Sequence, residues 1–220
     1  MTDIDLSVSI PELIAPRRNY LKGFSPEETN KLLSVPDNNT TLGKRNYAIM
    51  ILAVQTGLRA VDIVNLKRSD IDWREQKIRI TQHKTGKSLC IPLEVESGNA
   101  ISDYLLNARP KCDIPNIFIA HKGIKRATAK PLSSTALSTF VRKYAVSAGI
   151  DASNSKRRAF HGFRRGFGTR LLEAEIPLEL IQQMMGQSEV DSLVPYLATE
   201  EQGLKKCALP LIETEIGGDS

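Results

Sequence analysis

Three side chains that could carry chemistry stand in the last third of the sequence. His161 and Arg164 are three residues apart, which on a helix places them on one face with Cβ atoms about 5–6 Å apart. An imidazole and a guanidinium that point at one place could bind an anionic group and move a proton. Tyr196 follows an apolar segment of helical period and is a candidate nucleophile. The same residues would also fit an ion-pairing helix face and a packing tyrosine.

A further basic candidate lies nearer the N-terminus, in the sequence T-G-L-R at residues 56–59. An arginine directly after a tight helix end is held rigidly, and we expect Asp62, three residues later, to orient the Arg59 guanidinium. That guanidinium is planar and always charged, so it can bind phosphate oxygens through two parallel hydrogen bonds. A helix-turn-helix joint with a surface arginine is the structural alternative.

Two lysines, Lys84 and Lys87, lie in the turn of a predicted hairpin. Residues 77–82 and 88–93 are β-rich runs that alternate in polarity, and the sequence H-K-T-G-K joins them. Taken alone, both lysines are ordinary turn residues.

The remaining elements form the framework that must position these side chains. Ser25, Pro26 and Glu28 have the N-cap, N1 and N3 pattern of a capping box. Gly57 is expected to stop a buried helix. Residues 117–119 are expected to form a short strand that joins the hairpin as its third strand. Expected helices span roughly residues 26–33, 44–56, 96–108, 134–149 (capped by Ser133 or Ser134) and 200–209.

Composition and length indicate the class of protein. The chain has 220 residues, of which 41% are hydrophobic and 25% charged, as in ordinary soluble globular domains. It has no apolar run long enough to span a membrane and no signal-peptide pattern at its N-terminus, so we expect a cytoplasmic protein without a membrane partner. Three scattered cysteines predict reduced thiols and no metal site. They are Cys90, Cys112 and Cys207.

Positive charge is concentrated in one part of the chain. Residues 121–170 contain twelve Lys or Arg and one acid, a net charge of +11, whereas residues 171–220 contain ten acids and two bases, a net charge of −8. A block this one-sided would repel itself without a polyanion. Nucleic acid is therefore the expected partner.

Taken together, these features resemble the tyrosine recombinases, the phage-integrase family. In that family H-x-x-R, an L-G-H-S-like turn and a tyrosine recur in this order and spacing, and here His161, Arg164, M-G-Q-S at residues 185–188 and Tyr196 match. T-G-L-R with an acid three residues later resembles the family's first arginine motif. The resemblance implies a mainly α domain with a small antiparallel β-sheet, the DNA breaking-rejoining fold.

The resemblance also implies a role for each candidate. Arg59 and Arg164 would neutralise the non-bridging oxygens of a DNA phosphodiester, and His161 would accept or share the proton of Tyr196. Lys84, in the K-T-G-K hairpin, would protonate the departing 5′-oxygen. The 3′-phosphotyrosyl product could be resealed by a 5′-hydroxyl without ATP, metal or another cofactor. The candidate DNA-binding side chains are Lys87, Lys122, Lys125, Arg126, Arg142, Lys143, Arg157, Arg158 and Arg165.

Three residues depart from the family pattern. Gln187, a further candidate catalytic residue, stands where the family usually has histidine or tryptophan. Glutamine can donate a hydrogen bond to a phosphate oxygen but cannot be protonated, which predicts reduced rather than abolished chemistry. Glu175 replaces a glycine common between two helices, at a cost on the order of 1 kcal/mol. Pro195 stiffens the approach to Tyr196.

The resemblance covers roughly residues 23–200, the expected catalytic domain. Residues 1–22 are expected to be a leader or linker, and residues 201–220 a helix and tail that could dock on a neighbouring subunit. This leaves no room for the small helical DNA-gripping domain that normally precedes the family's catalytic domain. The chain is therefore interpreted either as a fragment or as a short recombinase that grips DNA weakly alone.

The predicted function is a site-specific recombinase of double-stranded DNA, monomeric in solution and tetrameric on paired sites. Two other functions remain open from the sequence. One is a monomeric DNA relaxase of the type IB topoisomerase kind. The other is a catalytically degenerate integrase-like protein that binds DNA without cutting it, an alternative that Gln187 and the missing clamp domain keep open.

Overall fold

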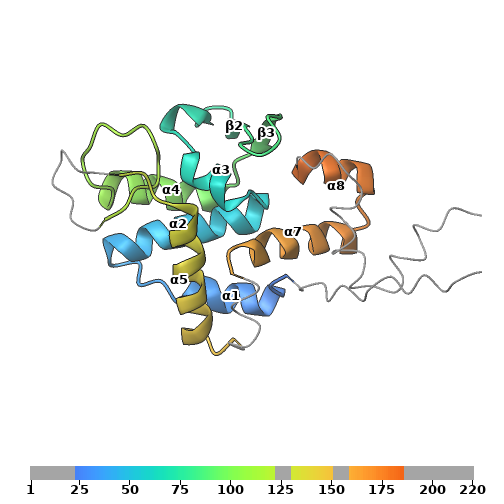
Figure 1. The fold of residues 1–220 in the computed structure, drawn as a ribbon, viewed down its shortest axis with the longest axis horizontal. Helices are drawn as coiled ribbons and strands as arrows, with labels where there is room; N and C mark the ends of the chain where they lie inside the picture. Colours follow the sequence, from blue (N-terminus) through green and yellow to red (C-terminus); the bar gives the residue numbers. More distant parts are fainter. Residues whose placement is uncertain (1–22, 122–129, 151–158, 186–220) are drawn as a thin grey trace, which may run out of the picture.

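The computed structural model describes residues 23–121, 130–150 and 159–185, and Figure 1 shows their arrangement. The described part is mostly helical with one small antiparallel sheet, which confirms the predicted fold class. The predicted leader at 1–22, the helix at 200–209 and the tail lie outside the described residues. The α-helices are α1 (Pro26–Ser34), α2 (Thr41–Thr56), α3 (Ala60–Asn65), α4 (Val95–Asn107), α5 (Ser134–Ser147), α7 (His161–Glu173) and α8 (Leu178–Met185).

Helix α2 is the centre of the core. It packs against α1, α4 and α7, and its residues 48–53 are all buried. The predicted stop at Gly57 is confirmed, because Gly57 has φ of 61° in the left-handed region and its N–H donates to the Ala53 carbonyl. The capping box at Ser25 is also confirmed, with the Ser25 side chain accepting from the N–H of Glu28. These two caps fix where the first helices begin and end.

The sheet has the order β1 (Ile71–Asp72), β2 (Lys77–Thr81) and β3 (Ser88–Pro92). Strands β2 and β3 form the predicted hairpin, in which Ile78 pairs with Ile91 and Thr81 with Ser88.

The predicted third strand at 117–119 is wrong, since β1 fills that place. Residues 117–119 have fully buried side chains and make their backbone contacts elsewhere. Ile117 donates its N–H to Leu66, and Ile119 forms an isolated bridge with Pro131. Burial of consecutive side chains on both sides favours this inserted position over the edge of a sheet with one exposed face.

The segment just before α1 lies directly against α7. A Cβ at Gly162 would come within 2.6 Å of the Phe24 ring, and one at Gly166 within 2.6 Å of the Phe24 carbonyl oxygen. The Phe24 N–H donates to the Gly162 carbonyl at 3.2 Å, and the rings of Phe24 and Phe163 are 5.0 Å apart. We refer to Phe24, Gly162 and Gly166 as the glycine seam, and it sets the position of α7.

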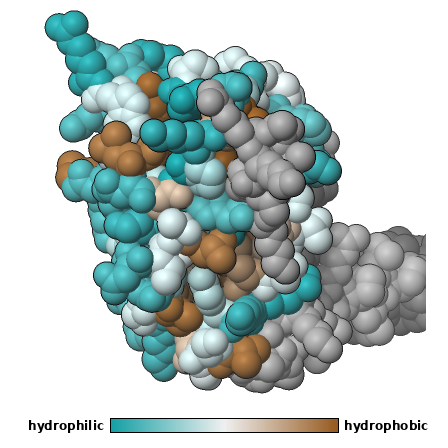
Figure 2. All heavy atoms as spheres, turned by 90° about the vertical axis from the view of Figure 1, so that its left-hand side faces the viewer, coloured by the Kyte–Doolittle hydropathy of each residue, from teal (hydrophilic) through white to brown (hydrophobic). Residues whose placement is uncertain are grey.

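Helix α8 buries Ile181 and Met185 in a small cluster of its own, against α7. Figure 2 shows the face at the left of Figure 1, where hydrophilic residues surround small, separate apolar groups. Within the described ranges, no helix is both long and apolar enough to cross a membrane.

Candidate active site

Arg59 occupies the N-cap position of α3, two residues after the left-handed Gly57. Its Nη1 donates to Oε1 of Gln82 at 3.0 Å. The expected pairing with Asp62 is wrong: the Asp62 carboxylate instead accepts the backbone N–H of His83 at 2.9 Å. Asp62 is buried, with 4% of its surface exposed, and its Oδ2 has no hydrogen-bond partner in the described part of the chain. This carboxylate therefore fastens the hairpin to α3 rather than orienting the arginine.

Arg164 is buried, with 2% of its surface exposed, and joins three elements. From α7, its Nη1 donates to the Gly57 carbonyl and its Nη2 to the Met185 carbonyl, both at 2.7 Å. Gly57 follows α2 and Met185 ends α8, so the two bonds tie both helix ends to α7. Carbonyls at the ends of helices lack partners within the helix, and a guanidinium satisfies them well.

Gln82 is a site residue that the sequence reasoning missed. It follows β2 directly and is 1% exposed. Its Oε1 accepts from Arg59 and also from Thr85 Oγ1 at 2.8 Å, and its Nε2 donates to the Met185 carbonyl at 3.2 Å. The alternation of the strand could have indicated this residue. Ile78 and Ile80 face the core, and Gln82, two residues further on, lies on the same side. A polar residue at the next inward position indicates a buried hydrogen-bond network.

His161 is the first residue of α7, one turn before Arg164. Desolvation, together with the positive charges of Arg165, Arg164, Arg59 and Lys84, lowers the pKa of His161 to about 4. The residue still has exposed surface, so desolvation of the ring is incomplete and water or a ligand can reach it. Charges from the α3 turn, the hairpin turn and α7 thus act on one imidazole, which is neutral at pH 7 and is a weak base as long as no anion offsets these charges.

The structure places the other predicted residues as follows. Lys84 and Lys87 are exposed in the hairpin turn, and Arg142 and Lys143 are exposed on α5. Arg165 is partly buried on α7. Several predicted residues lie outside the described residues: Gln187, Tyr196, Lys122, Lys125, Arg126, Arg157 and Arg158.

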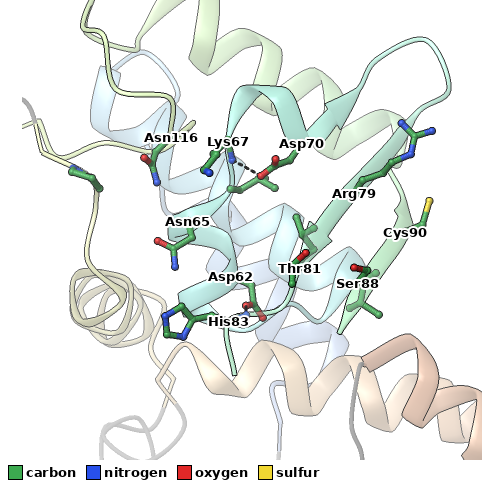
Figure 3. Close-up of a pocket in the computed structure, with 14 residues that line it drawn as sticks. Asp62, Asn65, Lys67, Asp70, Arg79, Thr81, His83, Ser88, Cys90 and Asn116 are labelled. Atoms are coloured by element: carbon green, nitrogen blue, oxygen red, sulfur yellow. Dashed lines mark hydrogen bonds between the residues drawn. The ribbon is translucent and has the colours of Figure 1, made fainter. Parts of the chain in front are cut away.

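A hollow of about 900 Å³ lies beside the hairpin. Figure 3 shows Asp62 and His83 close together at one end of it, with Asn65 and Asn116 on one side and Ser88 on the other. The mixture of amide, hydroxyl and charged groups suits a polar ligand better than an apolar one. Within residues 23–121, 130–150 and 159–185, no group of three or more His, Cys, Asp or Glu could hold a metal ion.

Comparison with known proteins agrees with this geometry. The family model described as the phage integrase family matches residues 22–202. The chain belongs to the phage integrase family. This integrase-family chain is 33% identical over 185 residues to the putative integrase/recombinase y4gC of Sinorhizobium fredii, which covers 84% of this chain and 92% of that protein. It is 30% identical over 193 residues to the tyrosine recombinase XerD of Xanthomonas axonopodis pv. citri, covering 86% of this chain and 62% of that protein.

Solved structures of similar fold include recombinases. XerA recombinase superposes with a TM-score of 0.67 at 24% identity, over 84% of this chain and 63% of that chain. XerH site-specific recombinase, in a post-cleavage complex with its palindromic difH substrate, superposes with a TM-score of 0.69 at 20% identity, over 86% of this chain and 53% of that chain. The integrase-family chain therefore has the fold of a tyrosine recombinase catalytic domain. It spans 53–63% of the length of XerD, XerA and XerH.

Proposed function

We propose that this chain is the catalytic part of a site-specific tyrosine recombinase, which cleaves and rejoins strands of double-stranded DNA through Tyr196. The observation that carries the proposal is that Gln82 and the Met185 carbonyl link Arg59 to Arg164, one turn after His161 on α7, and that the charges of both arginines and of Lys84 help to lower the pKa of His161. A cluster of cations around a neutral histidine is costly to assemble and needs an anion to balance it. A phosphodiester at the same place would balance these charges.

The proposed mechanism uses each group for one task. The two arginines bind the non-bridging oxygens of the scissile phosphate and stabilise the charge that builds up there. The Tyr196 hydroxyl, whose ordinary pKa is near 10, loses its proton to His161 as the oxygen attacks phosphorus. Lys84 protonates the 5′-oxygen that departs.

Attack by the 5′-hydroxyl on the phosphotyrosine reverses these proton transfers and frees the tyrosine. One phosphodiester is exchanged for one phosphotyrosyl bond, so the bond energy is retained.

Binding of DNA is proposed to extend beyond the scissile phosphate. Lys87 and the exposed pair Arg142 and Lys143 supply backbone contacts, and the hollow beside the hairpin offers polar side chains to base edges or phosphates. The protein acts as a monomer in solution and as a tetramer on two paired sites, where strands are exchanged.

Covalent trapping tests the proposed function. The substrate is a nicked duplex with a randomised region. Cleavage near the nick releases a short fragment that carries the 5′-hydroxyl needed for rejoining, so the protein–DNA adduct is trapped and survives a denaturing wash. We expect the parent protein to give adducts whose recovered DNA shares a sequence, and Tyr196→Phe to give none. Salt-sensitive binding without adducts in the parent would instead support a DNA-binding protein that does not cut. Adducts and relaxation of supercoiled DNA by the monomer would support the topoisomerase-like alternative.

A further inference from the structure

Gln82 lies where three parts of the candidate site meet. Its side chain contacts Arg59 of the α3 turn, Thr85 of the hairpin turn and the carbonyl of Met185 at the end of α8. Both lone pairs of its oxygen and one of its two N–H groups are therefore used inside the protein.

The partners also fix which way the carboxamide faces. A guanidinium can only donate, so Arg59 requires the oxygen on its side. A backbone carbonyl can only accept, so Met185 requires the nitrogen on the other side. The glutamine is therefore held in one orientation, with its acceptor toward the arginine and its donor toward α8.

The Met185 carbonyl joins this network to the second arginine. It accepts from Gln82 Nε2 at 3.2 Å and from Arg164 Nη2 at 2.7 Å. Met185 is the last residue of α8, so its carbonyl has no partner within the helix. Arg59 is thus linked to the end of α8 through one side chain, and Arg164 is linked to it directly.

A purely structural role explains this residue poorly. Ile78 and Ile80 fill the preceding inward positions of the strand, and an apolar side chain of similar size would fill the next one without a desolvation penalty. A carboxamide at a position with 1% exposure is useful only if its hydrogen bonds have a role.

We propose that Gln82 is a positioning residue for strand cleavage, which orients the Arg59 guanidinium and makes its orientation depend on the docking of α8. This inference rests on the proposed function, because Arg59 is assigned to the phosphate there. In the sequence α8 is followed by Gln187 and Tyr196, so the same helix end leads to the nucleophile. Displacement of α8 would remove the Met185 carbonyl from Gln82 Nε2, so the carboxamide that accepts from Arg59 would lose the partner that fixes its orientation.

Gln82→Met tests the inference, because methionine has a similar size and shape but makes no such hydrogen bond. We expect the single-turnover cleavage rate at saturating nicked duplex to fall roughly 10-fold to 100-fold, as for other residues that orient a catalytic group, with the DNA dissociation constant unchanged within about twofold. Gln82→Glu keeps an acceptor for Arg59, but it adds a negative charge and places a carboxylate oxygen against the Met185 carbonyl, so relative to Gln82→Met it should recover only part of the rate. Ile80→Val, in the same strand, is the control for a loss of packing alone.

A double variant separates orientation of Arg59 from other effects. Because Gln82 acts through Arg59, adding Gln82→Met to Arg59→Ala should lower the cleavage rate no further. Multiplicative losses, or a parental rate in Gln82→Met, would overturn the inference. So would an equal loss of rate in Gln82→Met and Ile80→Val.

A measurement without DNA distinguishes failure of the inference from failure of the proposed function. Nitrogen-15 NMR of the arginine side chains, with Arg59 assigned by Arg59→Lys, reports whether its guanidinium is restrained. We expect a restrained signal in the parent, an intermediate one in Gln82→Glu and a mobile one in Gln82→Met. The same restraint in the parent and in Gln82→Met would contradict the inference even if the parent cleaves DNA. Absence of adducts from the parent would bear on the proposed function alone.

Discussion

The surroundings of the His161 imidazole lower its pKa. Its pKa is lowered from 6.5 to about 4 by desolvation and by four nearby cations. The unfolded chain therefore binds a proton between about pH 6.5 and pH 4 that the folded chain does not, so folding stability should decrease as the pH falls through this window. An NMR titration of the histidine ring, assigned with His161→Asn, should give a midpoint near pH 4.

Removal of one cation should raise that midpoint. Arg165 contributes the largest charge effect on His161, so Arg165→Gln is expected to move the pKa of His161 up toward its ordinary value. Arg142→Gln removes a charge that is exposed on α5 and is the matched control, expected to leave the midpoint in place. Identical midpoints in parent and Arg165→Gln would show that the charge of Arg165 does not contribute to the lowered pKa of His161.

Gln187 is the residue where the proposed chemistry differs from the family pattern. Its amide can donate a hydrogen bond to a phosphate oxygen but cannot take up or release a proton. We expect Gln187→His to cleave the trapped duplex roughly 10-fold faster, a modest share of what a well-placed acid or base contributes. Gln187→Asn is the control. Equal cleavage rates for parent and Gln187→His would mean that glutamine at this position does not slow the reaction.

At the scale of elements, the joint between α7 and α8 carries measurable strain. Glu175 has φ of 57°, in the region that favours glycine, which confirms the left-handed position expected from the sequence. Glu175→Gly should raise the free energy of unfolding by about 0.5–1 kcal/mol. Glu175→Ala removes the same side-chain contacts but keeps the strain, so it should not gain stability. Denaturant unfolding of the three proteins checks this.

The glycine seam should tolerate no added carbon. In Gly166→Ala the new Cβ would meet the Phe24 carbonyl at 2.6 Å, so the backbone must shift, and we expect a loss of roughly 1–3 kcal/mol. Gly98 in α4 is the control, because a Cβ there meets only Leu93 at 3.6 Å. Gly98→Ala should instead stabilise by about 0.5–1 kcal/mol, as alanine does in a helix interior. Thermal unfolding measures both variants. An equal loss of melting temperature in Gly166→Ala and Gly98→Ala would contradict this account of the seam.

Local signals predicted most elements, and long-range contacts decided the exceptions. The Ser25 capping box, the Gly57 stop and the hairpin each depend on a few neighbouring residues. The position of residues 117–119 depends on Leu66 and on the chain near Pro131, which no local pattern indicates. The partner of Arg59 was missed for the same reason, because an acid three residues away is visible in the sequence and a glutamine 23 residues away is not.

At the scale of the whole molecule, the site is assembled from distant segments. Arg59, Lys84 and His161 come from the α3 turn, the hairpin turn and the start of α7. The resemblance predicted that these residues act together, but it gave neither the burial of Arg164 nor the shared Met185 carbonyl. Those features depend on how α7 and α8 pack, and packing geometry cannot be read from motif order.

Basic side chains spread over the surface should contribute to DNA affinity through contacts with phosphates. Each phosphate contact releases counterions, so the logarithm of the binding constant should fall linearly with the logarithm of salt concentration. Arg142→Gln with Lys143→Gln should reduce that slope by up to about 2, roughly 1 per contact. Lys111→Gln, an exposed lysine outside the predicted contacts, is the control and should leave the slope unchanged. Fluorescence anisotropy over a salt series measures the slopes, and unchanged slopes in the double variant would exclude α5 from the interface.

The seam also has a mechanical consequence. The backbone of Phe24 is bonded to Gly162, one residue after His161, and Gly23 lies against the backbone of Gly166. Tension applied to the chain ahead of Gly23 would therefore load the first turn of α7 before it reached α2 or the sheet. A handle attached ahead of Gly23 in an optical trap would therefore transmit force to the helix turn that carries His161 and Arg164.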